Sequence, residues 1–217
     1  LSGLVGSEMC IRDSFWTYEH SRVKLAAPLC PTDPGSNYLN GSFINPLRHR
    51  GVHRLYVATQ APLPSTYLAF WTMIWEQRAR VIVMLTQELE GGLRKCHAYW
   101  HAGAIAPLSV HVRSEQALDA HLRPVDDEGV PVFMRRVLCL ANERSVEPPR
   151  EIVQLQFLAW PDHGVPSSPT PLLRLIAEAN AAQCAPAAAE DAAWLQPTPG
   201  PIVVHCSAGV GRSGAYI

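Results

Sequence analysis

Apolar residues recur along the chain in two patterns, one with helical spacing and one typical of strands. Residues 66–79 (TYLAFWTMIWEQRA) predict a helix with Ser65 as its N-cap, and Pro62 and Pro64 prevent an earlier start. The apolar side chains of this segment share one broad helical face: Tyr67, Phe70, Trp71, Ile74 and Trp75. Burial of aromatic rings is enough to explain this face, so we assign it to the core and not to a ligand site.

A second helix is expected directly after Ser168-Pro169, because proline is favoured in a first helical turn. Its apolar face is formed at helical spacing by Leu172, Leu173, Ile176 and Ala179.

The strand signals are shorter. Residues 81–86 (VIVMLT) form a continuous apolar run rich in branched residues, which predicts a strand buried on both faces. Residues 201–205 (PIVVH) predict another buried strand, after an Ala- and Pro-rich surface connection at 183–200. Weaker candidates, in which apolar and polar residues tend to alternate, are 108–113, 132–140 and 151–158. Strands separated by helices predict an α/β fold with a mixed central sheet.

Composition narrows the class of protein. The 217 residues are 47% hydrophobic and 17% charged, which is typical of a globular chain able to bury a core. The 18 basic and 19 acidic residues nearly balance, which argues against nucleic acid as a partner. We find neither a secretory leader nor an apolar run near the roughly 20 residues of a membrane helix. A soluble protein is therefore expected. We also expect it to be cytoplasmic and a monomer.

Cysteine and histidine spacing gives no sign of a metal site. The six cysteines are scattered, without a CxxC pair, and we interpret them as free thiols in a reducing compartment. The nine histidines form no HExxH-type pair. We therefore expect no metal site.

The strongest chemical signal is the segment 205–214 (HCSAGVGRSG), which follows the last predicted strand. A tight turn entering a helix offers converging backbone N–H groups to a phosphate, and Gly209 and Gly211 would allow close approach and positive φ. Arg212 can bind phosphate oxygens with two parallel hydrogen bonds. The same positive potential would favour a thiolate at Cys206, which is the nucleophilic form.

Phosphoryl transfer also requires a proton for the departing oxygen. Asp162 lies between Trp160 and Gly164 in the segment 160–164 (WPDHG), which predicts a mobile loop. Alone this is an ordinary turn, but with the Cys206 segment it supplies a candidate general acid.

These residues resemble the protein tyrosine phosphatase family, the phosphotyrosine-specific, cysteine-dependent branch, and in particular a non-receptor-type catalytic domain. The 205–214 segment is similar to the family's signature loop, and 160–166 (WPDHGVP) to its acid-bearing loop. Five further blocks agree in order: YEHSRVKL at 18–25, NYLNGSFI at 37–44, TQAPLP at 59–64, FWTMIWEQ at 70–77 and KCHAYW at 95–100.

The resemblance implies hydrolysis of phosphotyrosine in proteins through a phosphocysteine, without a metal or organic cofactor. Cys206 would attack phosphorus, and Asp162 would act as acid and then as base. Arg212 would hold the phosphoryl oxygens, Ser213 would hydrogen-bond the sulfur and His205 would tune the thiolate. The phosphate would bind along the loop formed by Cys206, Ser207, Ala208, Gly209, Val210, Gly211 and Arg212.

The resemblance also implies supporting residues. Glu90 would orient Arg212 through an ion pair, Lys95 would contact the acid-bearing loop, and Trp160 would anchor it. Glu90 and Lys95 could equally be ordinary surface charges, because exposed ion pairs are common and weak.

The ends of the chain depart from the family pattern. Residues 4–14 (LVGSEMCIRDS) resemble translated sequencing-adapter sequence, so we expect 1–14 to be artefactual and 15–217 to be a partial catalytic domain. A recognition tyrosine expected before Tyr18 is absent, and the family continues beyond Ile217. Our hypothesis is a C-terminally truncated translation. A dual-specificity phosphatase and a phosphotyrosine-binding pseudoenzyme remain alternatives.

Overall fold

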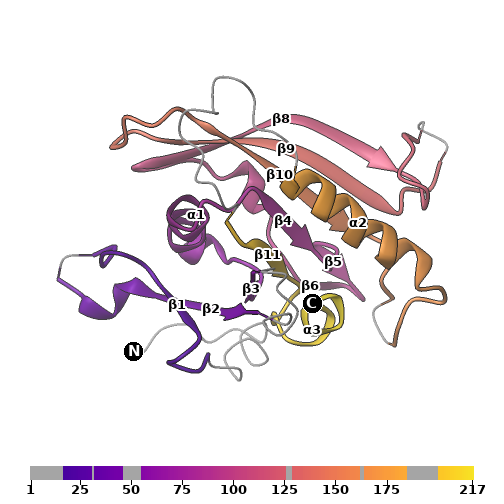
Figure 1. Cartoon of the computed structure of the whole chain (residues 1–217), viewed down its shortest axis with the longest axis horizontal. Helices are drawn as coiled ribbons and strands as arrows, with labels where there is room; N and C mark the ends of the chain where they lie inside the picture. The colour runs from indigo at the N-terminus through magenta and orange to yellow at the C-terminus, as the bar shows by residue number, and fades with distance from the viewer. Residues whose placement is uncertain (1–16, 31, 46–54, 126–128, 162–163, 185–199) are drawn as a thin grey trace.

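A mixed β-sheet forms the centre of the molecule (Figure 1). The computed structural model describes residues 17–30, 32–45, 55–125, 129–161, 164–184 and 200–217. Within these ranges nine strands pair in the order β1-β2-β3-β11-β4-β10-β9-β8-β7. The strands are β1 (Arg22–Lys24), β2 (Tyr38–Ile44), β3 (Tyr56–Thr59), β4 (Val81–Met84), β7 (Gly103–Ile105), β8 (Leu108–Leu118), β9 (Phe133–Asn142), β10 (Arg150–Phe157) and β11 (Ile202–His205).

The central strands β3, β11, β4 and β10 run parallel, whereas the outer pairs are antiparallel. A separate small hairpin consists of β5 (Leu89–Glu90) and β6 (Leu93–Arg94). The helices are α1 (Tyr67–Glu76), α2 (Thr170–Cys184) and α3 (Gly211–Tyr216), with short 3-10 turns η2 (Pro34–Asn37), η3 (Pro64–Thr66) and η4 (Tyr99–His101). The predicted α/β class with a mixed sheet is confirmed.

Helices cover both faces of the sheet, with α1 on one side and α2 on the other (Figure 1). The four residues of β4 are all buried. Ile82 and Met84 belong to the hydrophobic cluster of α1, and Val81 and Val83 to that of α2. Successive side chains of a strand point to opposite faces, so a strand covered on both sides must be apolar throughout. The prediction of a doubly buried strand here is confirmed.

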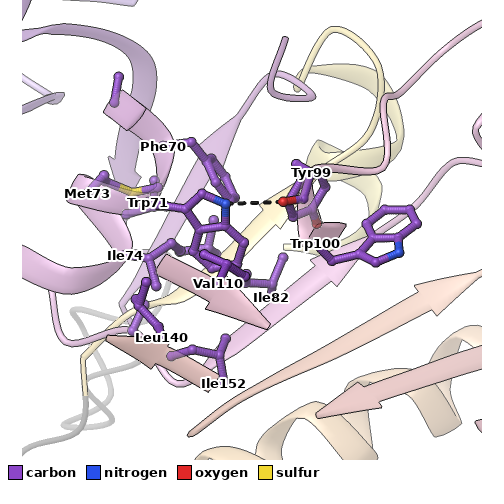
Figure 2. Packing of buried hydrophobic residues seen from close by; sticks show 14 of the residues in the cluster. Phe70, Trp71, Met73, Ile74, Ile82, Tyr99, Trp100, Val110, Leu140 and Ile152 are labelled. Carbon is purple, nitrogen blue, oxygen red and sulfur yellow. Dashed lines mark hydrogen bonds between the residues drawn. The ribbon is translucent and has the colours of Figure 1, made fainter. Parts of the chain in front are cut away.

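The aromatic face of α1 packs into the core, as predicted (Figure 2). Phe70 lies edge-on to Tyr99 of η4, with ring centroids 5.1 Å apart. The Trp71 indole Nε1 donates a hydrogen bond to the Tyr99 carbonyl oxygen at 3.3 Å. These contacts hold η4 against α1.

Two details of the helices differ from the sequence prediction. The N-cap of α1 is Thr66 and not Ser65, because the 3-10 turn η3 precedes the helix. In α2, Leu173 is 62% exposed, whereas Leu175, Ala179 and Gln183 are buried. Ala179 is buried as predicted, and Leu172 and Ile176 pack against the same cluster, so the predicted face is confirmed except for Leu173.

Other predictions concern strand limits. β8 and β9 extend beyond the predicted 108–113 and 132–140, because they form one long antiparallel hairpin. Strands β1, β2, β3, β5, β6 and β7 were not predicted. The predicted artefactual segment 1–14, and most of the connection at 183–200, lie outside the described residues.

No helix in the described ranges is long and apolar enough to cross a bilayer. The described histidine, cysteine and acidic side chains form no group of three suited to a metal ion. The described cysteines, which are Cys30, Cys96, Cys139, Cys184 and Cys206, carry free thiols.

Candidate active site

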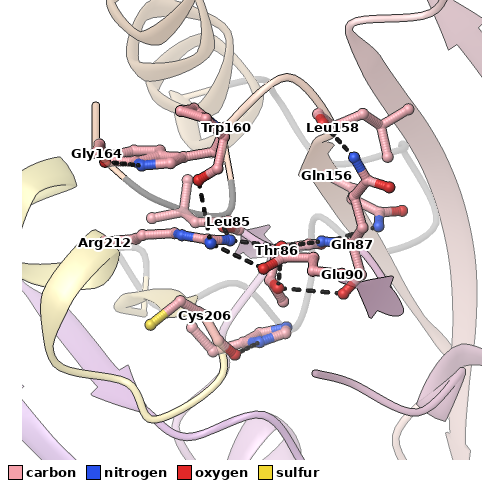
Figure 3. Close-up of polar contacts among 12 residues, drawn as sticks. Leu85, Thr86, Gln87, Glu90, Gln156, Leu158, Trp160, Gly164, Cys206 and Arg212 are labelled. Carbon is pink, nitrogen blue, oxygen red and sulfur yellow. Dashed lines mark hydrogen bonds and ion pairs between the residues drawn. The ribbon is translucent and has the colours of Figure 1, made fainter. Parts of the chain in front are cut away.

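The predicted site residues converge where the parallel strands end. Open sheets commonly bind ligands at the carboxyl ends of their parallel strands. The loop of Cys206 follows β11, Glu90 comes shortly after β4, and Trp160 follows β10. Figure 3 shows Cys206, Arg212, Glu90 and Trp160 gathered at this edge.

The Cys206 loop is held to both neighbouring strands. The Leu85 N–H donates to the His205 carbonyl at 2.8 Å, and the Ala61 N–H donates to the Ser207 carbonyl at 2.9 Å. Cys206 itself is 5% exposed, and its Sγ accepts a hydrogen bond from the Gly209 N–H at 3.2 Å. The sulfur therefore lies inside a turn whose backbone directs a donor at it.

The two loop glycines differ in what the backbone requires of them. Gly209 has φ 79°, and a Cβ there would collide with the backbone of Thr59 and Gln60. Gly211, the first residue of α3, is outside the positive-φ region, and a Cβ there would meet no atom within 4 Å. The prediction of positive φ is confirmed for Gly209 and wrong for Gly211, because the helix has already begun there.

We expect Gly209→Ala to destabilise the fold and Gly211→Ala to leave it intact. A left-handed backbone costs a non-glycine residue about 1–3 kcal/mol, and overpacking adds a further cost of about 1–3 kcal/mol. Alanine at Gly211 enters a helix, where it is favoured by up to about 1 kcal/mol. Denaturant unfolding of the two variants checks this, and equal stabilities would contradict the geometry.

Arg212 is fixed by a bidentate ion pair. Its NH1 and NH2 groups donate to the two carboxylate oxygens of Glu90 at 2.6 and 2.8 Å. Glu90 also accepts from Thr86 Oγ1 at 2.7 Å and from the Gln87 N–H at 3.0 Å. Burial alone would raise the pKa of Glu90, but the hydrogen bonds from Arg212, Thr86 and Gln87 outweigh it and lower the pKa. The carboxylate therefore stays charged opposite the guanidinium.

The other hydrogen bonds of Arg212 go to backbone carbonyls in the segments that follow β4 and β10. NH1 also donates to the Leu85 carbonyl at 3.1 Å, and NH2 makes a longer bond of 3.4 Å to the Pro161 carbonyl (Figure 3). Within the described part of the chain, Nε is the nitrogen of this guanidinium without a described acceptor. A phosphate could take Nε directly and displace the long bond at NH2.

His205 lies fully buried behind the loop. Its Nδ1 is 3.1 Å from the Cys206 carbonyl oxygen and its Nε2 is 2.8 Å from the Tyr99 hydroxyl. The described contact between His205 and Cys206 is therefore made to the backbone carbonyl of Cys206.

Ser213 differs from what the resemblance implied. Its side chain is fully buried, and Ser213 Oγ has no hydrogen-bond partner among the described residues. The bond to the sulfur that the resemblance implied is not formed here; the described donor to Cys206 Sγ is the Gly209 N–H.

The acid-bearing loop is described only in part. Trp160 is 7% exposed, packs edge-on against Phe157 and donates from Nε1 to the Gly164 carbonyl at 3.4 Å, which ties the loop ends together. Asp162 lies outside the described residues. The Lys95 N–H bonds the Glu88 carbonyl at 2.8 Å, and the expected contact of its side chain with the loop stays a prediction.

Sequence reasoning missed the residues that hold these groups from behind. Glu90 is positioned by the side chain of Thr86. Arg212 is positioned by the backbone carbonyls of Leu85 and Pro161. A backbone contact does not depend on residue type, so it cannot be recognised in the sequence. Tyr99 stood within the quoted block 95–100, but its contact with His205 joins residues far apart in sequence.

Comparison with known proteins agrees with this geometry. The family model for protein-tyrosine phosphatases matches residues 8–217, and the chain belongs to this family. It is 40% identical over 203 residues to receptor-type tyrosine-protein phosphatase F of Danio rerio, covering 92% of this chain and 9% of the relative. It is 39% identical over 203 residues to receptor-type tyrosine-protein phosphatase C of Homo sapiens, covering 92% of this chain and 14% of the relative. These relatives carry receptor-type names, although the sequence resemblance was assigned to the non-receptor type.

Proposed function

We propose that this chain hydrolyses phosphotyrosine in proteins through a phosphocysteine intermediate. The observation that carries the proposal is the placement of Cys206, in a turn that directs a backbone N–H at its sulfur, beside an arginine locked by a bidentate carboxylate. Donors directed at developing negative charge are the largest source of catalysis in transfer reactions of this kind. Family membership supports the same chemistry.

The proposed reaction has two steps. In the first, the Cys206 thiolate attacks phosphorus, the bond from phosphorus to the tyrosyl oxygen breaks, and Asp162 gives that oxygen its proton. In the second, water attacks phosphorus while Asp162 takes its proton, the phosphorus–sulfur bond breaks, and inorganic phosphate leaves with the thiolate restored. Arg212 binds the phosphoryl oxygens in both steps.

The proposed setting is a reducing, cytoplasmic one, supported by the free thiols of the described cysteines. Phosphotyrosine-containing proteins are the proposed partners, and a monomer is the proposed working state. Because the relatives carry receptor-type names, we also propose that this domain forms part of a receptor-type protein.

Matched phosphotyrosine and phosphoserine peptides test the specificity. We expect kcat/KM to be higher for phosphotyrosine by at least about 100-fold, because a pocket built for one substrate shape loses binding with another. Equal values would indicate a dual-specificity phosphatase. Tight peptide binding without turnover would instead indicate a pseudoenzyme.

The pH dependence of kcat/KM tests the proposed acid. We expect a bell-shaped profile, because Cys206 must be deprotonated while Asp162 is protonated. Replacement Asp162→Asn should remove the falling limb at high pH and lower the maximum by about 100-fold or more. A falling limb that persists in this variant would show that another residue is the acid.

A further inference from the structure

A row of polar side chains crosses the sheet on the face that η4 covers; Arg136 and Gln154 are buried, whereas the side chain of Glu115 is 42% exposed. Glu115 of β8, Arg136 of β9 and Gln154 of β10 stand directly opposite one another in neighbouring strands. Arg136 is 5% exposed; its guanidinium carbon lies 4.1 Å from the centroid of the Trp100 ring, and its Nε pairs with the Glu115 carboxylate. The buried guanidinium of Arg136 needs an explanation, because apolar replacements of buried ionic groups are often as stable.

Arg136 sets the direction of the hydrogen bonds around it. Its NH1 donates to Gln154 Oε1 at 3.0 Å and to Gln156 Oε1 at 2.8 Å. A guanidinium has donors and no acceptor, so both amide oxygens must face it. Each glutamine therefore presents its NH₂ group away from Arg136, toward the active site.

One branch leads to the backbone of Cys206. Gln154 Nε2 donates to the Tyr99 hydroxyl at 2.7 Å, and this hydroxyl lies 2.8 Å from His205 Nε2. Burial raises the pKa of Tyr99 well above its ordinary value, so the hydroxyl keeps a proton that can be donated to His205 Nε2. The proton of His205 is then on Nδ1, which lies 3.1 Å from the Cys206 carbonyl, a group that can only accept. Both ends of the branch require the same tautomer.

The other branch leads to Arg212. Gln156 Nε2 donates to the Thr86 carbonyl at 3.0 Å, and Thr86 Oγ1 donates to Glu90 Oε1 at 2.7 Å. The carboxylate of Glu90 in turn accepts hydrogen bonds from both terminal nitrogens of Arg212. Figure 3 shows this sequence of contacts from Gln156 to Arg212.

We propose that Arg136 is a positioning residue for the reaction: by donating to both Gln154 and Gln156 it orients two hydrogen-bonded branches that end at Cys206 and Arg212. The proposal rests on the proposed phosphatase function. One branch holds His205 as its Nδ1–H tautomer and so anchors the peptide from which the Cys206 loop begins. The second branch holds the carboxylate that presents Arg212. Arg136 acts through these residues and touches no reacting atom.

Replacement Arg136→Met tests the proposal with readouts that do not depend on turnover. ¹⁵N NMR of the His205 ring reports its tautomer, and peptide mass spectrometry after iodoacetamide treatment reports the alkylation rate of Cys206 against pH. We expect a mixed His205 tautomer and an alkylation profile moved to higher pH, because a loosened loop directs its amides less well at the sulfur. We also expect kcat to fall by roughly three- to tenfold, the size of one lost hydrogen bond.

Arg150→Met is the matched control. Arg150 also stacks on an indole, with its guanidinium carbon 3.8 Å from the centroid of Trp75, and it also pairs with a carboxylate, that of Glu147. These partners are outside the two branches, so this variant should lose comparable packing and keep the His205 tautomer and the alkylation profile of the wild type.

A wild-type tautomer and alkylation profile in Arg136→Met would overturn the proposal, as would equal shifts in Arg150→Met. If Arg136→Met does not fold, Gln154→Met and Gln156→Met interrupt one branch each. Gln154→Met should alter the His205 tautomer, whereas Gln156→Met should keep it and lower kcat; wild-type behaviour in both would overturn the proposal. The two proposals can fail separately. If the wild type does not hydrolyse phosphotyrosine, the phosphatase function is contradicted. If Arg136→Met nevertheless changes the His205 tautomer, the positioning role of Arg136 is supported.

Discussion

Replacement Cys206→Ser should remove hydrolysis of a phosphotyrosine peptide, with a loss in kcat of at least about 10⁴-fold. A serine hydroxyl at this position has no adjacent base among the described residues to activate it, because the bond from the Gly209 N–H favours an anion but removes no proton. Steady-state release of inorganic phosphate measures the effect.

Phosphopeptide binding provides the control for this variant. Arg212 and the loop backbone are unchanged in Cys206→Ser, so isothermal titration should show affinity within about tenfold of the wild-type KM. Lost binding together with lost turnover would indicate a damaged loop. Turnover near the wild-type rate would remove Cys206 from the mechanism.

Arg212→Lys should lower kcat by roughly 10²- to 10³-fold, a loss typical of removing one preorganised donor to the transition state. Lysine keeps the positive charge but cannot form two parallel bonds, either to Glu90 or to phosphate oxygens. A kcat within threefold of the wild type would show that charge alone, without the bidentate geometry, is sufficient. Single-turnover rates separate this effect from product release.

The ion pair between Glu90 and Arg212 can also be tested through the pH dependence of the free energy of unfolding. The folded protein lowers the pKa of Glu90 below its ordinary value of 4.5, so the stabilisation is complete above that value and is lost as the pH falls through the folded-state pKa. The difference in unfolding free energy between the wild type and Glu90→Gln should therefore shrink on acidification below about pH 4.5. A difference that stays constant to pH 2 would contradict the assigned ionisation.

Much of the fold followed from spacing along the chain. The run at 81–86 predicted a strand covered on both faces, because four consecutive apolar residues have no solvent-facing side, and β4 is such a strand. The aromatic face of residues 66–79 predicted core packing in the same way. The convergence of Cys206, Arg212 and Glu90 agrees with the resemblance, although their roles in the reaction stay predictions.

The failures have physical causes that spacing does not encode. Polar and apolar residues alternate in 151–158, which is typical of a strand with one side facing solvent, yet Gln154 and Gln156 are 0% and 3% exposed. Their amide oxygens accept hydrogen bonds from Arg136, which belongs to another strand. The pattern of one strand cannot distinguish polar residues that bind such a partner from polar residues that face solvent. Gly211 was interpreted as a turn residue because composition does not show at which residue a helix begins.

Trapping the covalent intermediate tests the central claim most directly. Rapid acid quenching of a reaction with ³²P-labelled phosphotyrosine peptide, followed by proteolysis and mass spectrometry, locates the label on the protein. We predict phosphate on the sulfur of Cys206, formed and lost at rates compatible with turnover and absent in Cys206→Ser. Phosphate on any other residue, or hydrolysis with no labelled protein at any quench time, would contradict the account.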